Sequence, residues 1–195
     1  MTNVVQELKA RIENEGQNLG NGILKIDSLI NHQLDSKLMM DCGKEFAERF
    51  ADAGVTRVLT AEVSGIAPAL ATGFALNVPI VYARKTKPVT MFGPIYLETA
   101  PSHTKGMEVN LMVSAEFIPA GQRILIVDDF LASGKTIKSL IRIVEAAQCE
   151  LVGVACVVEK VFEEGREMLT KYGVPVESIV KILSLDDGQI ILDES

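Results

Sequence analysis

The chain has 195 residues, of which 48% are hydrophobic and 23% charged, a balance typical of an ordinary globular protein. This length favours one domain with a sizeable core. The net charge of −7 argues against nonspecific nucleic-acid binding, which needs a basic surface. No segment is long and apolar enough to span a membrane, and no signal-peptide pattern begins the chain, so we expect a cytoplasmic protein.

The three cysteines, at positions 42, 149 and 156, have no motif spacing and are expected to be buried thiols. His32 and His103 lie far apart in the sequence. The sequence therefore shows no pattern of histidine and cysteine ligands for zinc.

Helix and strand signals alternate over the first part of the chain. Asn3 and Asp35 can each cap a helix, and Gly16 should end the first of them. Between these helices we expect a weak strand at 23–26 and then an irregular polar stretch at 27–33.

A strand–helix–strand unit follows. Residues 57–61 read as a buried strand, a turn with glycine and proline leads to a short helix that ends near Phe74, and 79–83 is the next strand. This order predicts two parallel neighbouring strands. A basic cluster at 84–87 comes directly after the second strand.

From about residue 86 to 119 the pattern loosens. Prolines and glycines interrupt two short alternating runs at 95–99 and 109–113. This stretch is either a hairpin-like or mobile insertion, such as a lid, or a plain antiparallel extension at the edge of the sheet.

The second half of the chain continues the alternation of elements. We expect strands at 124–128, 151–158, within 176–185 and at 190–192, and helices at 135–147 and 163–172. The carboxyl ends of parallel strands meet at one edge of a sheet, so the loops that follow the parallel strands should converge on one ligand site.

The central motif spans residues 124–136 and reads I-L-I-V-D-D-F-L-A-S-G-K-T. A short apolar strand leads to Asp128 and Asp129, and then a turn of small residues leads into an amphipathic helix. Backbone N–H groups at such a turn bind anions, and the helix dipole assists them. Because the two acids need hydroxyls or a metal, a phosphorylated sugar suits both halves of the motif.

The end of this motif, Gly134-Lys135-Thr136, also looks like the end of a nucleoside-triphosphate-binding P-loop. That loop requires a further glycine five residues before Gly134. Asp129 occupies that position, so we exclude the NTPase reading.

The motif resembles the phosphoribosyl-pyrophosphate signature of type I phosphoribosyltransferases. Stretches at 24–33, 64–68, 83–85 and 158–160 extend the resemblance over nearly the whole chain, to the bacterial xanthine-specific group. The resemblance implies an α/β fold of the type I phosphoribosyltransferase kind, with a mostly parallel central sheet flanked by helices. It also implies a single domain, 1–195, with a small hood built from 1–34 and the C-terminal segment.

The function that the resemblance implies is purine salvage. The enzyme would transfer 5-phosphoribosyl from phosphoribosyl pyrophosphate (PRPP) to N9 of xanthine, giving xanthosine monophosphate (XMP) and pyrophosphate. A guanine/hypoxanthine or adenine phosphoribosyltransferase, or a non-catalytic PRPP-sensing regulator, remains an alternative. The family further implies a homodimer without nucleic-acid or membrane partners, and Mg²⁺ chelated by the substrate without a dedicated protein cage.

The resemblance also implies roles for individual residues. Asp128 and Asp129 are the expected catalytic pair and would bind the ribose hydroxyls. The expected PRPP-binding residues are Ala132, Ser133, Gly134, Lys135 and Thr136 for the 5′-phosphate, and Ser64, Gly65, Arg84 and Lys85 for the pyrophosphate. The expected xanthine-binding residues are Leu24, Asn31 and Lys160. Structural roles remain open beside these: a capping pair for the acids, a plain turn for Ser64-Gly65, core packing for Leu24, and solvated charges for Arg84, Lys85 and Lys135.

Overall fold

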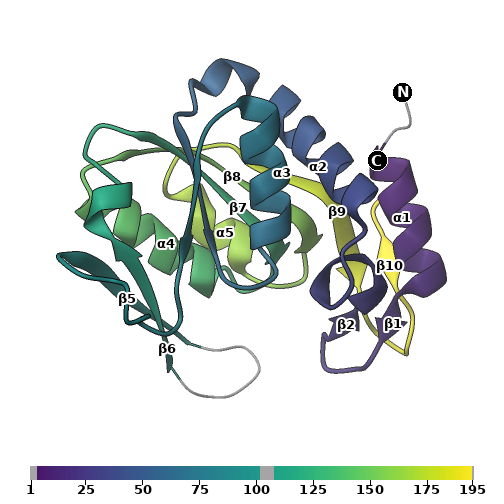
Figure 1. Ribbon diagram of the computed structural model, residues 1–195. Coiled ribbons are helices and arrows are strands. Elements are labelled where there is room, and N and C mark those ends of the chain that lie inside the picture. The colour runs from purple at the N-terminus through teal and green to yellow at the C-terminus, as the bar shows by residue number, and fades with distance from the viewer. Residues whose placement is uncertain (1–3, 102–107, 195) are drawn as a thin grey trace.

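The computed structural model describes residues 4–101 and 108–194 and shows a central sheet with helices on both faces (Figure 1). The helices are α1 (Val4–Glu15), α2 (Ser36–Arg49), α3 (Ile66–Leu76), α4 (Lys135–Ala146) and α5 (Gly165–Thr170). The strands are β1 (Gln17–Asn18), β2 (Leu24–Lys25), β3 (Arg57–Ala61), β4 (Ile80–Ala83), β5 (Ile95–Pro101), β6 (Glu108–Ser114), β7 (Arg123–Leu131), β8 (Glu150–Lys160), β9 (Val176–Ser184) and β10 (Ile191–Leu192).

The main sheet has the order β10-β9-β8-β7-β3-β4. Its five longer strands run parallel, and only the short edge strand β10 is antiparallel. The predicted strand–helix–strand units are therefore confirmed, because β3 pairs with β4 and β7 pairs with β8 in parallel. The order of the strands reverses between β3 and β7. From β3 the chain passes through α3 to β4 at one edge of the sheet, whereas from β7 it passes through α4 to β8, toward the opposite edge.

Alternate residues of the central strand face opposite sides of the sheet, as the two-residue period of a strand requires. Leu125 and Val127 of β7 belong to a core with α1, α2 and α3. Ile124 and Ile126 belong to a second core with α4 and α5. Both faces are covered, so β7 reads as a continuous apolar run in the sequence.

The second helix begins as predicted. The Asp35 carboxylate accepts a hydrogen bond from the backbone N–H of Leu38 at 3.1 Å, and it also accepts one from Arg11 at 2.9 Å. Gly43 then lets α2 approach α3 closely, because a Cβ at this position would lie 2.4 Å from the backbone carbon of Ala71. Asn3, the predicted cap of α1, lies outside the described residues.

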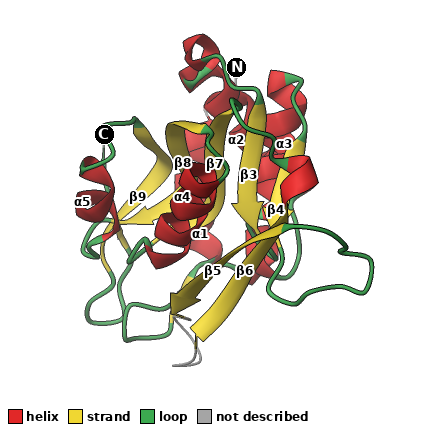
Figure 2. Ribbon diagram, turned by 90° about the vertical axis from the view of Figure 1, so that its left-hand side faces the viewer, coloured by secondary structure: helices red, strands yellow, loops and turns green. Residues whose placement is uncertain are grey.

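The insertion forms a hairpin of its own, as one of the two alternatives predicted. Strands β5 and β6 pair antiparallel and lie outside the main sheet (Figure 2). A single bridge between Arg84 and Met112 joins the hairpin to the end of β4, and the Ser139 hydroxyl of α4 donates to the Thr99 carbonyl at 3.1 Å. The plain extension of the sheet edge is therefore wrong, and residues 102–107 lie outside the described part of the chain.

Three local predictions differ from the structure. The strand β7 continues past the acidic pair to Leu131, because Phe130 still pairs with Val158 of β8. Residues 27–31 form one turn of π-helix rather than an irregular stretch. The helix expected over 163–172 covers only α5.

The N-terminal and C-terminal segments lie side by side (Figure 1). The side-chain amide of Asn18, in the small β1–β2 sheet, donates to the carbonyls of Leu185 and Gln189 at 2.8 and 2.7 Å. These bonds attach the β1–β2 sheet to the chain that precedes β10. Among the described helices, none combines the length and apolar character that a membrane crossing needs.

Candidate active site

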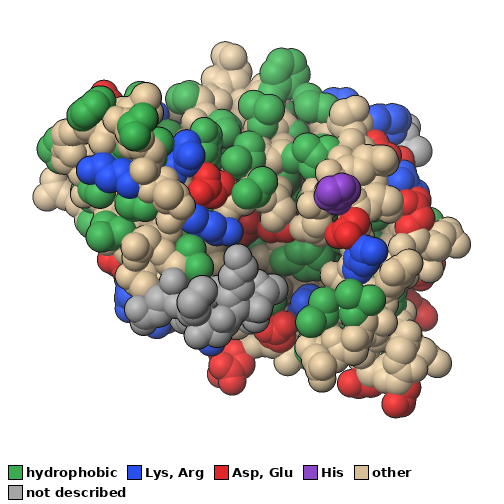
Figure 3. Space-filling model, turned by 60° about the horizontal axis from the view of Figure 1, so that its bottom comes forward, with side chains coloured by type: hydrophobic (Ala, Val, Ile, Leu, Met, Phe, Trp, Pro, Cys, Tyr) green, Lys and Arg blue, Asp and Glu red, His purple; other side chains and the backbone are tan. Residues whose placement is uncertain are grey.

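A cleft of about 900 Å³ opens at the carboxyl ends of β7 and β8, next to the point where the strand order reverses. In the space-filling view, acidic and basic side chains gather around the hollow in the middle of this face (Figure 3). The volume lies in the range of small-molecule sites. The predicted site residues that line the cleft are Leu24, Asn31, Ser64, Asp128, Asp129, Ala132, Ser133, Gly134, Lys135, Thr136 and Lys160.

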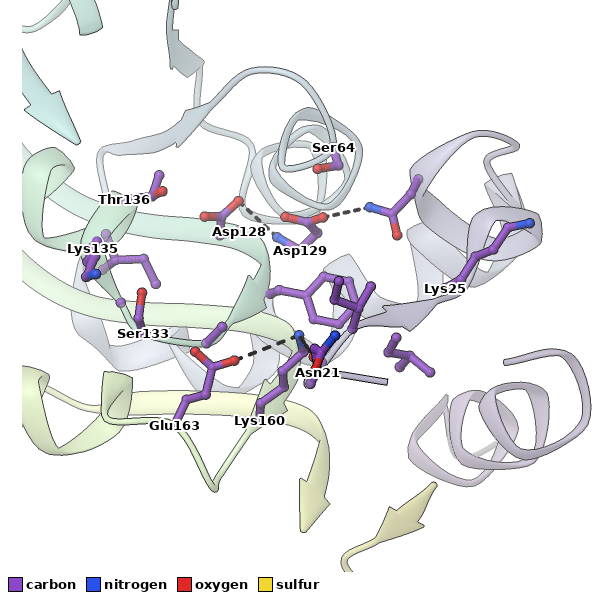
Figure 4. Close-up of a pocket in the computed structure, with 18 of the residues that line it drawn as sticks. Asn21, Lys25, Ser64, Asp128, Asp129, Ser133, Lys135, Thr136, Lys160 and Glu163 are labelled. Atoms are coloured by element: carbon purple, nitrogen blue, oxygen red, sulfur yellow. Dashed lines mark hydrogen bonds and ion pairs between the residues drawn. The ribbon is translucent and has the colours of Figure 1, made fainter. Parts of the chain in front are cut away.

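The acidic pair lies in the middle of the cleft (Figure 4). Asp128 is only 7% exposed, and one of its oxygens accepts the backbone N–H of Asp129 at 3.1 Å. Burial raises the pKa of Asp128 well above its usual range, and the neighbouring charge of Asp129 raises it further. A ligand that brings hydroxyl donors or positive charge therefore stabilises the ionised form of this buried carboxylate.

Gly65 lies behind Asp128 and does not line the cleft, whereas its neighbour Ser64 does. A Cβ at Gly65 would lie 2.5 Å from an oxygen of Asp128 and 2.4 Å from the hydroxyl oxygen of Thr60. The backbone of the 62–65 loop therefore reaches the acid only because a side chain is missing at this position. The loop also contains a cis peptide bond between Glu62 and Val63.

The loop between β7 and α4 forms one side of the cleft, where Figure 4 shows Ser133, Lys135 and Thr136. Gly134 precedes the first residue of α4 and has a φ of 71°, a left-handed conformation that favours glycine. The loop thus presents main chain and small side chains at a helix N-terminus, where unpaired N–H groups and the helix dipole favour an anion. The side chain of Lys135 is exposed.

Lys160 lies across the cleft from this loop (Figure 4). Its ammonium donates to the carbonyl of Gly22 at 2.6 Å and lies 5.5 Å from the centre of the Phe130 ring. Burial lowers the pKa of Lys160. Leu24 is 8% exposed and adds an apolar wall.

Asn31 connects two regions of the cleft that the resemblance treats separately. Its side-chain amide donates to Asp129 at 2.9 Å. Asn31 would contact the base and Asp129 the ribose, so the geometry places the two expected subsites within one hydrogen bond of each other.

Arg84 and Lys85 do not line the cleft. Arg84 forms an ion pair with Glu62 at 2.8 Å and lies 5.8 Å from the centre of the Tyr82 ring. The backbone N–H of Lys85 donates to the other oxygen of Glu62 at 2.6 Å. Both residues connect the end of β4 to the 62–65 loop, and through the loop they adjoin the cleft.

Several lining residues carried no role in the sequence interpretation: Leu19, Asn21, Gly22, Ile23, Lys25, Asp27, Phe130, Ile137 and Glu163. Of these residues, Phe130 was the easiest to predict from the sequence, because it directly follows the two acids. Its side chain packs against the first core, whereas Leu131 belongs to the second, so the alternation seen over 124–127 does not continue through the acidic pair. The residues at 19–23 had no such signal, since their position depends on the turn between β1 and β2.

Asp128→Asn tests the electrostatic state of the site. The substitution replaces a buried acid, whose ionisation the fold disfavours, with a neutral amide that keeps an oxygen able to accept from Asp129, so we expect the ligand-free variant to be more stable than the native protein at pH 7. In the folded protein the pKa of Asp128 lies above its ordinary value of 3.8. The cost of the native charge therefore grows as the pH rises from 3.8 through the folded-state pKa, and it vanishes below 3.8.

Urea unfolding of both proteins between about pH 3 and about pH 8 measures this difference. A variant that is less stable than the native protein at neutral pH would contradict the assignment of Asp128 as a destabilised buried acid.

The comparisons with known proteins agree with this geometry. The model of the phosphoribosyl transferase domain matches residues 41–184. The chain is 48% identical to a xanthine phosphoribosyltransferase of Deinococcus deserti over 94% of this chain and 95% of the relative. It is 47% identical to one of Moorella thermoacetica over 96% of this chain and 95% of the relative.

Solved structures of adenine phosphoribosyltransferases have the same fold. The protein of Thermoanaerobacter pseudethanolicus matches with a TM-score of 0.74 at 22% identity, over 91% of this chain and 99% of the other. The protein of Saccharomyces cerevisiae matches with a TM-score of 0.71 at 24% identity, over 92% and 99%. The expected fold class is therefore confirmed, and the chain belongs to the phosphoribosyltransferase family.

Proposed function

We propose that the protein is a xanthine phosphoribosyltransferase of purine salvage. It would transfer 5-phosphoribosyl from PRPP to N9 of xanthine and release XMP and pyrophosphate. The observation that carries this proposal is one cleft that combines an acidic pair whose first member, Asp128, is buried, a loop of small residues at a helix N-terminus, and a half-buried lysine. Support for xanthine as the acceptor also comes from the relatives that bear this name at 42–48% identity.

PRPP would lie along the loop and the acids. The 5′-phosphate would bind the main chain and hydroxyls of the 132–136 loop, and the ribose hydroxyls would donate to Asp128 and Asp129. The pyrophosphate would extend toward Ser64. Gly65, Arg84 and Lys85 would support this end from behind, because they fix the 62–65 loop rather than line the cleft.

Xanthine would bind between Leu24 and Phe130 on the other side of the cleft. The ammonium of Lys160 has donors only, so it would favour a purine oxo group over the 6-amino group of adenine. Asn31 offers both a donor and an acceptor, which suits the alternating edge of an oxopurine.

The reaction would be a displacement at the anomeric carbon of the ribose. N9 of xanthine forms the new bond to the anomeric carbon as the bond to pyrophosphate breaks; the leaving group takes the electron pair, and the imidazole proton of the purine is released to solvent. The carboxylates of Asp128 and Asp129 would offset the positive charge that develops on the sugar. The protein would contribute orientation and charge placement, without a covalent nucleophile.

Mg²⁺ fits this site as an ion brought by the substrate. Within the described residues, no three acidic, histidine or cysteine side chains come together as a metal cluster. Mg²⁺ typically uses one or two carboxylates together with substrate phosphates, and Asp128 and Asp129 offer two carboxylates. The ion would neutralise part of the charge of the pyrophosphate.

A purine panel tests the acceptor. With PRPP and Mg²⁺, we expect turnover of xanthine to exceed that of guanine, hypoxanthine and adenine.

Lys160→Met should lower kcat/KM for xanthine by about 10- to 100-fold, because a hydrogen bond from a charged donor is worth about 1.5–3 kcal/mol. Lys171→Met is the matched control, since Lys171 lies over the Tyr172 ring and outside the cleft lining.

Two results would contradict the proposal. Preference for adenine would refute the oxo-reading role of Lys160. Binding of PRPP without turnover of any purine would favour the regulator instead.

The acidic pair is tested by the double variant Asp128→Asn, Asp129→Asn. We expect kcat to fall by at least about 100-fold, since both charges that face the ribose are lost. The matched control is Asp52→Asn, at an exposed position before Gly54. Circular dichroism confirms folding, and a folded double variant with near-native turnover would show that the acids have another role.

The family resemblance also implies a homodimer, and we propose one. An apolar surface at α2 and α3 supports it: Leu70 and Val63 line a groove there and are 57% and 75% exposed, and Phe74, one turn further along α3, is 75% exposed. Sedimentation should give twice the chain mass, and Phe74→Asp should shift the protein toward the monomer. A native protein that sediments as a monomer at all concentrations would refute the proposal.

A further inference from the structure

Arg166 of α5 forms an ion pair with Glu159 of β8 that has no role in the proposed reaction. It lies beside the 132–136 loop, the expected phosphate site. Glu159 is 1% exposed, and both of its oxygens are engaged. Arg166 donates to one oxygen from Nε and to the other from Nη2, each at 2.5 Å, and the Ser178 hydroxyl donates at 2.6 Å. Arg166 also donates to the Val176 carbonyl at 3.0 Å. One guanidinium thus joins α5 to β8 and β9.

The pair is charged at neutral pH. Burial alone would raise the pKa of Glu159, but the hydrogen bonds from Arg166 and Ser178 outweigh it and hold that pKa below its usual value. The two parallel hydrogen bonds of a bidentate arginine–carboxylate pair also fix the relative orientation of the two side chains. The position of Arg166 is therefore set by β8.

Gly165, which precedes Arg166, packs directly against the 132–134 loop, so the position of α5 determines the position of this loop. A Cβ at Gly165 would lie 2.2 Å from the carbonyl oxygen of Ala132 and 3.1 Å from the nitrogen of Gly134. From the other side, a Cβ at Gly134 would lie 2.5 Å from the terminal methyl of Met168 and 3.1 Å from the Cα of Gly165. The main chains of α5 and the loop are in direct contact, so neither can shift without the other.

We propose that Arg166 is a positioning residue for the 5′-phosphate site. It anchors α5 to the buried carboxylate of Glu159, and α5 then holds the 132–134 main chain in the shape that lines the cleft. The proposal rests on the proposed function in that the anion held there is the phosphate of PRPP.

The base side of the cleft has an anchor of its own. Lys160 follows Glu159 in β8 and therefore points to the opposite face of the strand. Its ammonium is held by the carbonyl of Gly22. Loss of the Arg166 pair should consequently affect PRPP much more than xanthine, whereas a general loss of structure would affect both.

The experiment compares four variants of the full chain. Arg166→Met removes the pair, Arg166→Lys keeps the charge without the bidentate geometry, and Gly165→Ala leaves the pair intact but pushes against the loop. Arg49→Met is the matched control, because Arg49 also donates to β9, at the Ser178 carbonyl, from the far side at α2. Each is assayed for kcat, for KM of PRPP and xanthine, for ribose 5-phosphate binding by calorimetry, and for urea unfolding.

We expect Arg166→Met and Gly165→Ala to raise KM for PRPP and weaken ribose 5-phosphate binding by about 10- to 100-fold, as small misplacements of a binding group do. KM for xanthine should stay near native. Arg166→Lys should recover part of the loss, and Arg49→Met should lower stability without changing either KM.

A folded Arg166→Met that binds ribose 5-phosphate like the native protein would overturn the proposal, and so would equal losses for PRPP and xanthine. If Arg166→Met does not fold, Arg166→Lys decides, because it lacks the bidentate geometry, and native ribose 5-phosphate binding by that variant would overturn the proposal. A native protein that binds ribose 5-phosphate but does not turn over xanthine would refute the proposed function alone. In that case ribose 5-phosphate binding by the variants still decides the role of Arg166.

Discussion

The burial of Asp128 at the end of the central strand is the constraint on which the site depends. A strand covered on both faces by helices carries its apolar run up to this carboxylate, which is left 7% exposed with a raised pKa. The fold loses free energy by burying the charge, and a ligand with hydroxyls or a cation recovers it. Stability and ligand binding therefore make opposite demands on this one residue.

The sheet topology places the other groups around that acid. Ser64 follows β3, the 132–136 loop follows β7, and Lys160 ends β8, so three parallel strands deliver three kinds of side chain to one edge. Asn31 comes from the N-terminal segment, which the C-terminal segment holds through Asn18. Residues more than one hundred positions apart thereby face a single cleft.

The sequence was sufficient to predict those elements of the fold and the site whose signals lie within a few neighbouring residues. The apolar run before Asp128 and the glycine before α4 predicted the strand, the turn and the helix. The strand β1 could not be predicted, because its two polar residues, Gln17 and Asn18, are held by pairing with β2 and by the side-chain bonds of Asn18 to the distant carbonyls of Leu185 and Gln189. Likewise, the capture of Arg84 by Glu62 depends on a contact between two loops, and no spacing in the chain encodes it.

The hydrogen bond from Asn31 to Asp129 has a consequence for cooperativity between substrates. In the proposed reaction, a ribose hydroxyl that engages Asp129 competes with the Asn31 amide and frees it for the purine. Each substrate then lowers the cost of accommodating the other, and thermodynamic reciprocity makes the two effects equal. A single side-chain contact in the free enzyme would thus couple the occupancy of the two halves of the cleft.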